Sequence, residues 1–316
     1  MAILSKTAST GVPKSGTSSK RRRREALWFY LFVSPWVLGF LVFLLGPMIA
    51  SVYYSMTDWD SFTPPTWIGL ENYVTLLTDD PRFWRTLWHT FYYAAVSVPL
   101  GLVLGLWLAN LLNKQVRARK LLRTLIYLPT LVPLVATAMI FRQVLAPNGP
   151  LNDGLGLFGV SGPAWLLDGN WAIPALVVMS AWSAGAATVL LLAAMKGIPR
   201  ELYEAAEVDG AGPVRQFWSI TLPHLTPIIF FNLVMGMIGA FQVFAQVYIL
   251  VPKGKLRAAY DGAETMVPYL FDEAFGNYHM GYASAISWLL FLVVLVFTLI
   301  AFRTARRWVF YETEVK

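Results

Sequence analysis

The sequence predicts an all-α integral membrane protein that crosses the bilayer six times. Three observations lead to this fold class: 57% of the 316 residues are hydrophobic, only 14% are charged, and the mean hydropathy is +0.55. Soluble domains carry about 25% charged residues, so this composition suits helices surrounded by lipid. The net charge of +7 comes from basic residues that flank apolar stretches. Basic residues in these positions indicate how the chain is oriented in a membrane, and no nucleic-acid partner is expected.

Residues 1–24 are predicted to form a disordered, basic cytoplasmic tail, because they are rich in Ser, Thr, Lys and Gly and end in four consecutive arginines. Residues 25–316 are predicted to form one membrane domain. Its first apolar stretch, about 27–54, is far longer than the core of a secretory signal, and no small-residue cleavage pattern follows it. We therefore expect an uncleaved first span.

Five further apolar stretches have the length of about 20 residues that a bilayer core requires. They cover about 86–112, 125–145, 171–195, 224–251 and 281–302. The third contains Pro129 and Pro133, and we expect kinks there of the kind that packed membrane helices tolerate.

Lysine and arginine are distributed unevenly over the segments between these spans. The tail, the loop at 113–123, the stretch at 196–215 and the segment after the sixth span hold 19 of the 25. Cytoplasmic segments carry this excess, so both termini are predicted to be cytoplasmic.

The most polar interruption of the second half of the chain lies at 199–223, where we expect two short helices joined by a turn. Pro199 suits a first helical turn, Gly210 a helix end, and Pro213 the start of a second helix. On the first helix Leu202, Ala205 and Ala206 share one side. A face of small residues gains little from burial and allows close approach, which indicates a docking site.

Two other interpretations of this hairpin remain open from the residues alone. An amphipathic hairpin between spans is often an interfacial segment on the membrane surface. A DNA-binding helix-turn-helix is disfavoured, because the first helix carries Glu201, Glu204, Glu207 and Asp209 and lies between membrane spans.

The predicted spans contain no Asp, Glu or Lys, and their one arginine, Arg142, lies close to an outer end. Ion-coupled transporters usually keep an ionisable residue near the middle of the membrane, so self-powered transport is disfavoured. The later spans instead hold uncharged polar and aromatic side chains that suit a sugar. The candidates for a substrate pathway are Trp182, Ser183, Asn232, Gln242 and Gln246, with Ser180 and Tyr248 nearby. Such residues also join membrane helices to one another, which is the alternative reading of each.

No catalytic or metal site is expected. The chain has no cysteine, and its three histidines, at 89, 224 and 279, are scattered without the spacing of metal ligands. A membrane-embedded enzyme would need a Ser/His or acidic cluster, whereas His89 and His224 lie at opposite span ends.

The hairpin resembles the EAA motif of the membrane subunits of bacterial binding-protein-dependent ABC importers. The matching positions are Glu204-Ala205-Ala206, then Gly210, then Ile220-x-Leu222-Pro223. The similarity covers most of the chain, which looks like the carbohydrate-importer permeases of the maltose and glycerol-phosphate type. The resemblance implies a six-span type I importer fold in a bacterial inner membrane.

The resemblance also implies a coupling helix that inserts into a cleft on an ATPase. The residues carried over to this role are Glu204, Ala205, Ala206, Asp209, Gly210, Ile220, Leu222 and Pro223. The implied partners are a second, different permease, two ATP-binding subunits that hold ATP and magnesium, and an extracytoplasmic solute-binding protein. In maltose-type relatives the span after the motif contacts substrate, which favours Asn232, Gln242 and Gln246.

We therefore expect a transport subunit that moves a sugar or sugar-like solute inward and holds no cofactor of its own. One alternative is a phosphorylated polyol such as glycerol phosphate, but only Arg142 could meet the phosphate. Another is a self-contained channel or secondary transporter, which would leave the cytoplasmic hairpin without a role.

Overall fold

The computed structural model describes residues 19–114, 119–251 and 257–310. The chain divides after Tyr53 into two compact units, which are considered separately. Most of the predicted disordered tail, residues 1–18, lies outside the described residues. The remainder is not disordered, because helix α1 begins at Ser19 and already contains the arginine run.

The first unit is a long apolar helix. α1 (Ser19–Phe40) continues through a π-helical turn (Leu41–Leu45) into α2 (Gly46–Tyr54), and residues Arg22–Tyr54 have the length and hydropathy of a membrane span. Its apolar side chains are largely exposed, with Phe43 at 82%. The first predicted span is confirmed as a helix of sufficient length.

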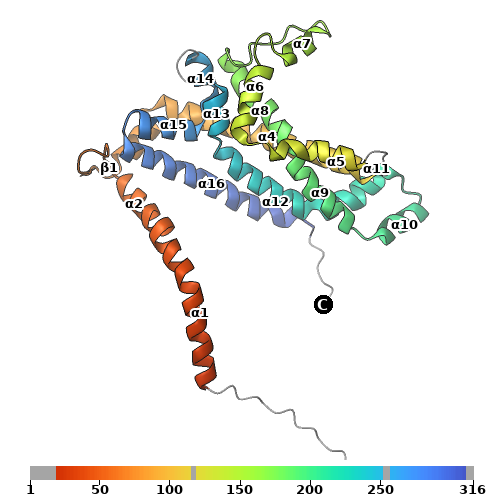
Figure 1. Ribbon diagram of the computed structural model, residues 1–316, viewed down its shortest axis with the longest axis horizontal. Helices are drawn as coiled ribbons and strands as arrows, with labels where there is room; N and C mark the ends of the chain where they lie inside the picture. The colour runs from red at the N-terminus through yellow and green to blue at the C-terminus, as the bar shows by residue number, and fades with distance from the viewer. Residues whose placement is uncertain (1–18, 115–118, 252–256, 311–316) are drawn as a thin grey trace, which may run out of the picture. The chain divides into compact units, whose positions relative to one another are not determined.

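The second unit is built on long helices that pack along one another (Figure 1). They are α4 (Pro81–Asn113), α8 (Gly169–Ala181), α9 (Gly185–Gly197), α12 (Leu222–Phe241) and α16 (Met280–Trp308). α4 lies against α8, α9 and α12. Glycines allow α4 to approach its neighbours closely: a Cβ added to Gly105 of α4 would lie 3.1 Å from the Cβ of Ala187, and one added to Gly236 of α12 would lie 3.0 Å from Val98 of α4. Small side chains at helix contacts are typical of packing in membranes.

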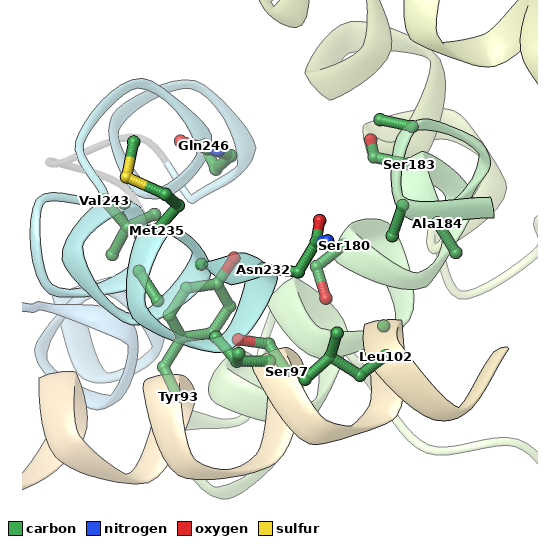
Figure 2. Close-up of a pocket in the computed structure, with 17 residues that line it drawn as sticks. Tyr93, Ser97, Leu102, Ser180, Ser183, Ala184, Asn232, Met235, Val243 and Gln246 are labelled. Carbon is green, nitrogen blue, oxygen red and sulfur yellow. The ribbon is translucent and has the colours of Figure 1, made fainter. Parts of the chain in front are cut away.

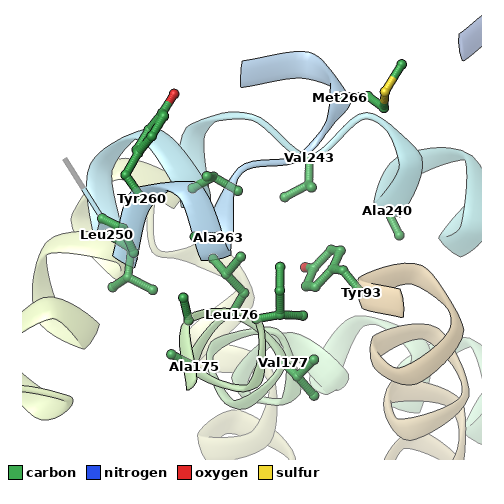
Figure 3. Packing of buried hydrophobic residues seen from close by; sticks show 14 of the residues in the cluster. Tyr93, Ala175, Leu176, Val177, Ala240, Val243, Leu250, Tyr260, Ala263 and Met266 are labelled. Atoms are coloured by element: carbon green, nitrogen blue, oxygen red, sulfur yellow. The ribbon is translucent and has the colours of Figure 1, made fainter. Parts of the chain in front are cut away.

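The largest core of the second unit lies where α8 meets α4 and the segment after α12. Leu176 is 1% exposed and belongs to the same buried cluster as Tyr93, Val243 and Tyr260 (Figure 3). The helices α13 (Ala245–Leu250), α14 (Arg257–Ala263) and α15 (Met266–Phe271) close this core and are followed by a π-helical turn (Asp272–Gly276). The side chains of 257 and 258 lie outside the description.

The third predicted span differs most from expectation. It is a pair of helices, α5 (Arg119–Tyr127) and α6 (Leu134–Val144), separated by a 3-10 turn (Leu128–Leu131) and bent by 101°. The bend falls within the stretch at 125–145 where kinks were expected, and the two helices together have the length and hydropathy of a span. Val132 adopts an extended conformation with ψ 127°, which is the region that a following proline imposes, so Pro133 ends one helix and starts another.

The fifth span also differs. α11 (Pro213–Gln216) and a π-helical turn (Phe217–Thr221) run directly into α12, so the second half of the hairpin and the span form one helix from Pro213 to Phe241. The predicted stretch at 224–251 is not one continuous helix, because α12 ends at Phe241 and α13 begins at Ala245.

Short elements complete the described chain. β1 (Thr57–Asp58) pairs antiparallel with β2 (Thr66–Trp67), followed by α3 (Glu71–Thr78), while α7 (Pro150–Gly156) follows α6. Within the described residues five helices are long and apolar enough to span a membrane, or six if the bent pair counts as one. The predicted fold class is confirmed, with one two-stranded ribbon that the sequence did not indicate.

Candidate functional site

The hairpin at 199–223 holds helix α10 (Arg200–Val208), which ends in a hydrogen-bonded cap. The amide of Gly210 donates to the carbonyl of Glu207 at 3.0 Å, and the amide of Ala211 donates to that of Ala206 at 2.8 Å. This pair of bonds is the Schellman motif, which requires a left-handed residue. Gly210 meets the requirement with φ +74°.

Two side-chain contacts fix α10 to the helix that follows. The hydroxyl groups of Tyr203 and Thr221 lie 2.8 Å apart, and Thr221 is 6% exposed within the π-helical turn. The amide of Gln216 donates to the carbonyl of Ala211 at 3.0 Å. These two hydrogen bonds therefore restrain the turn between α10 and the helix that follows.

The outer surface of the hairpin is apolar and acidic. Val208, Val214 and Trp218 are 88%, 74% and 64% exposed, and Glu204 and Asp209 are exposed beside them. Clustered exposed apolar side chains of this kind mark an interaction surface.

The structure brings all eight predicted coupling residues onto this hairpin. Glu204, Ala205, Ala206, Asp209 and Gly210 lie on α10 and its cap. Ile220 lies in the π-helical turn, and Leu222 and Pro223 begin α12; all three are partly buried.

A cavity of about 500 Å³ lies between α4, α8, α9, α12 and α13. Figure 2 shows Tyr93 and Ser97 of α4, Ser180 of α8 and Asn232 of α12 converging on it. Ser183 and Gln246 complete its polar lining, and among the described residues no Asp, Glu, Lys, Arg or His lines it. The cavity can therefore offer hydroxyl, amide and phenol groups in an otherwise apolar wall.

The predicted pathway residues divide into two groups. Ser183, Asn232 and Gln246 line the cavity, but Trp182 and Gln242 do not. The ring of Trp182 instead meets Phe141 edge to face, with centroids 5.9 Å apart, and Gln242 is exposed where α12 ends.

Sequence reasoning missed Tyr93 and Ser97 in the second span. The available signal was their spacing, since Tyr93, Ser97 and Gly101 recur every four residues and share one helix face. Ser97 and Tyr93 are 7% and 5% exposed, so they form the floor of the cavity.

A second polar cluster ties the start of α4 to the segment between α13 and α16. The Nη2 atom of Arg82 lies 2.5 Å from Glu264 and 3.0 Å from Asp272, and its Nη1 atom lies 2.9 Å from Glu273. The three acidic residues are at most 7% exposed. Buried carboxylates of this kind need a paired cation, so Arg82 is a structural centre of this region.

Two tyrosines extend this cluster. Tyr269 donates to Asp80 from its hydroxyl, and burial followed by the hydrogen bond to Asp80 raises the pKa of Tyr269. Burial and the charge of Asp272 likewise raise the pKa of Tyr260, which donates to Asp272 at 3.1 Å. Both phenols therefore remain neutral donors. The contacts join residues up to 191 positions apart, which no local pattern indicates.

Comparison with known families identifies the architecture. The model of the family described as "Binding-protein-dependent transport system inner membrane component" matches residues 101–308. The chain belongs to this family. It is a multi-pass inner membrane protein and the permease subunit of a binding-protein-dependent ABC importer, in which partner subunits hydrolyse ATP. Membership in this family rules out the two alternatives raised from the sequence, a self-contained channel and a membrane enzyme.

Individual relatives agree with this assignment. The chain is 41% identical over 298 residues to the probable ABC transporter permease YesP of Bacillus subtilis (strain 168), covering 94% of this chain and 96% of the relative. It is 35% identical to the trehalose/maltose transport permease MalF of Thermococcus litoralis, covering 92% and 97%. A chain of the crystallised bacterial alginate ABC transporter, in complex with a periplasmic protein bound to an alginate pentasaccharide, superposes with a TM-score of 0.78. That chain is 27% identical, with coverage of 91% of this chain and 96% of the other.

Proposed function

We propose that this permease moves a neutral, hydroxyl-rich sugar or oligosaccharide inward through the cavity between α4, α8, α9, α12 and α13. The observation that carries the proposal is the uncharged polar lining of that cavity. Hydroxyl and amide groups exchange hydrogen bonds with sugar hydroxyls, and the Tyr93 ring supplies an apolar surface for a sugar face. The volume of about 500 Å³ lies within the range of small-molecule sites.

The names of the relatives support a carbohydrate. MalF of Thermococcus litoralis is named for trehalose and maltose, and AraP of Bacillus subtilis (strain 168), 32% identical over 88% of this chain, is named for arabinooligosaccharides.

An anionic solute such as a phosphorylated polyol is the second candidate. A related transporter is described as importing the acidic polysaccharide alginate, so the architecture is compatible with anionic cargo. An anion would be held best by Arg or Lys. Arg142 is exposed on α6 and does not line the cavity, which favours a neutral cargo here.

The hairpin supports the proposed coupling. Val208, Val214 and Trp218 form an exposed apolar surface suited to a cleft on an ATP-binding subunit. The capped, hydrogen-bonded turn would pass movement of that subunit to α12, which lines the cavity.

The proposed assembly contains a second, different permease, two ATP-binding subunits and an extracytoplasmic binding protein. Residues 25–316 form the permease domain, the hairpin at 199–223 faces the cytoplasm, and both termini are cytoplasmic. The distribution of Lys and Arg supports this orientation.

The test is purification of the chain with its cellular partners and reconstitution in vesicles. ATP hydrolysis and uptake are measured with the binding protein and either a neutral oligosaccharide series or sugar phosphates. Stimulation by a neutral oligosaccharide is expected. Stimulation by phosphorylated solutes alone would overturn the neutral-sugar assignment, and purification without any ATPase would overturn the assembly.

A further inference from the structure

Two apolar grooves adjoin one another where α5 meets α9. The first has a volume of about 180 Å³ and the second about 310 Å³. Both are lined by Arg123 of α5 and Val189 of α9, while Ile126 lines only the first and Tyr127 only the second. They are distinct from the translocation cavity, with which they share no lining residue.

The charge at these grooves has one sign. Arg123 lines both grooves and Lys196 lines the first, and no acidic residue within 19–114, 119–251 or 257–310 lines either groove. Both side chains are exposed, and within the described residues neither lies in a salt bridge. Two cations beside apolar walls complement a ligand that has an anionic head and hydrocarbon tails.

The position of the grooves selects among such ligands. Lys196 lies in the last turn of α9, and α10 begins at Arg200, so the grooves lie at the end of the spans that carries the coupling hairpin. In the orientation proposed above, this end meets the cytoplasmic leaflet. Basic pockets between spans on that side bind anionic lipid headgroups.

We propose that an anionic phospholipid of the cytoplasmic leaflet occupies these grooves. Its phosphate lies between Arg123 and Lys196, and its two acyl chains lie along the two apolar grooves. A free phosphate would leave the walls lined by Ile126, Leu192 and Leu128 uncovered, whereas acyl chains bury them.

The proposed lipid site adjoins helix α10, which contacts an ATP-binding subunit in the proposed assembly. Only Gly197, Ile198 and Pro199 separate Lys196 from α10, and Ile198 is 9% exposed. A headgroup held at Lys196 therefore restrains the base of the coupling helix. The inference rests on the proposed orientation and predicts that ATP-driven uptake depends on anionic lipid.

The experiment uses the complete transporter in nanodiscs of phosphatidylcholine with or without phosphatidylglycerol. Native mass spectrometry counts retained lipids in the absence of solute, so failure here leaves the sugar assignment untouched. Retention of phosphatidylglycerol should fall about tenfold in the double variant Arg123→Gln/Lys196→Gln. In wild type, the ATPase stimulation by solute and binding protein should fall to the level of the double variant when phosphatidylglycerol is omitted.

Two controls separate lipid binding from general charge and folding effects. Arg303→Gln removes an exposed cation of α16 outside both grooves and should retain phosphatidylglycerol as wild type does. Arg123→Lys/Lys196→Arg keeps both charges and should restore retention. Equal retention by wild type and the double glutamine variant, or photo-crosslinking from Leu128 to the partner permease instead of lipid, overturns the proposal.

Discussion

The hydroxyl groups of Tyr203 on α10 and Thr221 in the π-helical turn lie 2.8 Å apart and join α10, the proposed coupling helix, to the helix that lines the cavity. We predict that Tyr203→Phe lowers solute-stimulated uptake several-fold while basal ATPase activity is retained. A lost hydrogen bond of this kind changes stability by about 1 kcal/mol, too little to unfold the chain. Uptake and ATP hydrolysis are measured on the same reconstituted sample.

The matched control for Tyr203 is Tyr92→Phe, because the hydroxyl of Tyr92 makes no hydrogen bond among the described residues. That variant should couple normally. Unchanged uptake by Tyr203→Phe would show that the contact does not transmit movement.

The helix cap at Gly210 provides a second prediction. Its φ of +74° is strained for any residue with a side chain, although no atom of the chain lies within 4 Å of an added Cβ. Gly210→Val should therefore insert and assemble but lose transport, since the β-branched residue disfavours the left-handed cap. Gly212→Ala is the control, because Gly212 has φ −67° and equally open surroundings. Full uptake by the valine variant would remove the cap from the mechanism.

Substitutions of the two glutamines after α12 distinguish a direct contact with the solute from a general effect of side-chain polarity. Gln246 lines the cavity and Gln242 does not. We expect Gln246→Leu to weaken the apparent affinity for solute by about tenfold, the effect of losing a polar contact, with basal ATPase activity preserved. Gln242→Leu should be close to wild type. The pattern is checked by the solute dependence of uptake, and the reverse ranking would place the pathway elsewhere.

Arg82 and Arg85 lie one helical turn apart and should differ in their effect on stability. Arg82→Met removes the closest cation from the buried carboxylates of Glu264, Asp272 and Glu273. The 3.4 Å contact of Arg85 with Glu264 does not replace it, so the substitution is expected to destabilise the fold by about 3–5 kcal/mol. Arg85 is 42% exposed and its two ion pairs are longer, at 3.4 and 3.9 Å, so Arg85→Met should change stability by about 0–1 kcal/mol. Thermal unfolding of the purified transporter measures both, and equal midpoints would contradict the central role of Arg82.

The sequence by itself determined the helical membrane class, the order of the apolar segments and the position of the polar hairpin at 199–223. Hydropathy, basic flanks and the spacing from Glu204 to Pro223 are local properties of the chain. They can be identified from the sequence because they do not depend on tertiary contacts. Gly210 was identifiable for the same reason, because a helix end followed by Pro213 needs a residue that tolerates positive φ.

The tertiary structure alone decided which polar side chains share a space. Tyr93 and Asn232 are 139 positions apart and meet only because α4 and α12 pack together. Gln242 lies where α12 ends and does not line the cavity, and the third apolar stretch bends by 101° near Pro133. Helix packing and helix breaks depend on neighbours that are distant in sequence, so the cavity, the Arg82 cluster and the two grooves between α5 and α9 became visible only in three dimensions.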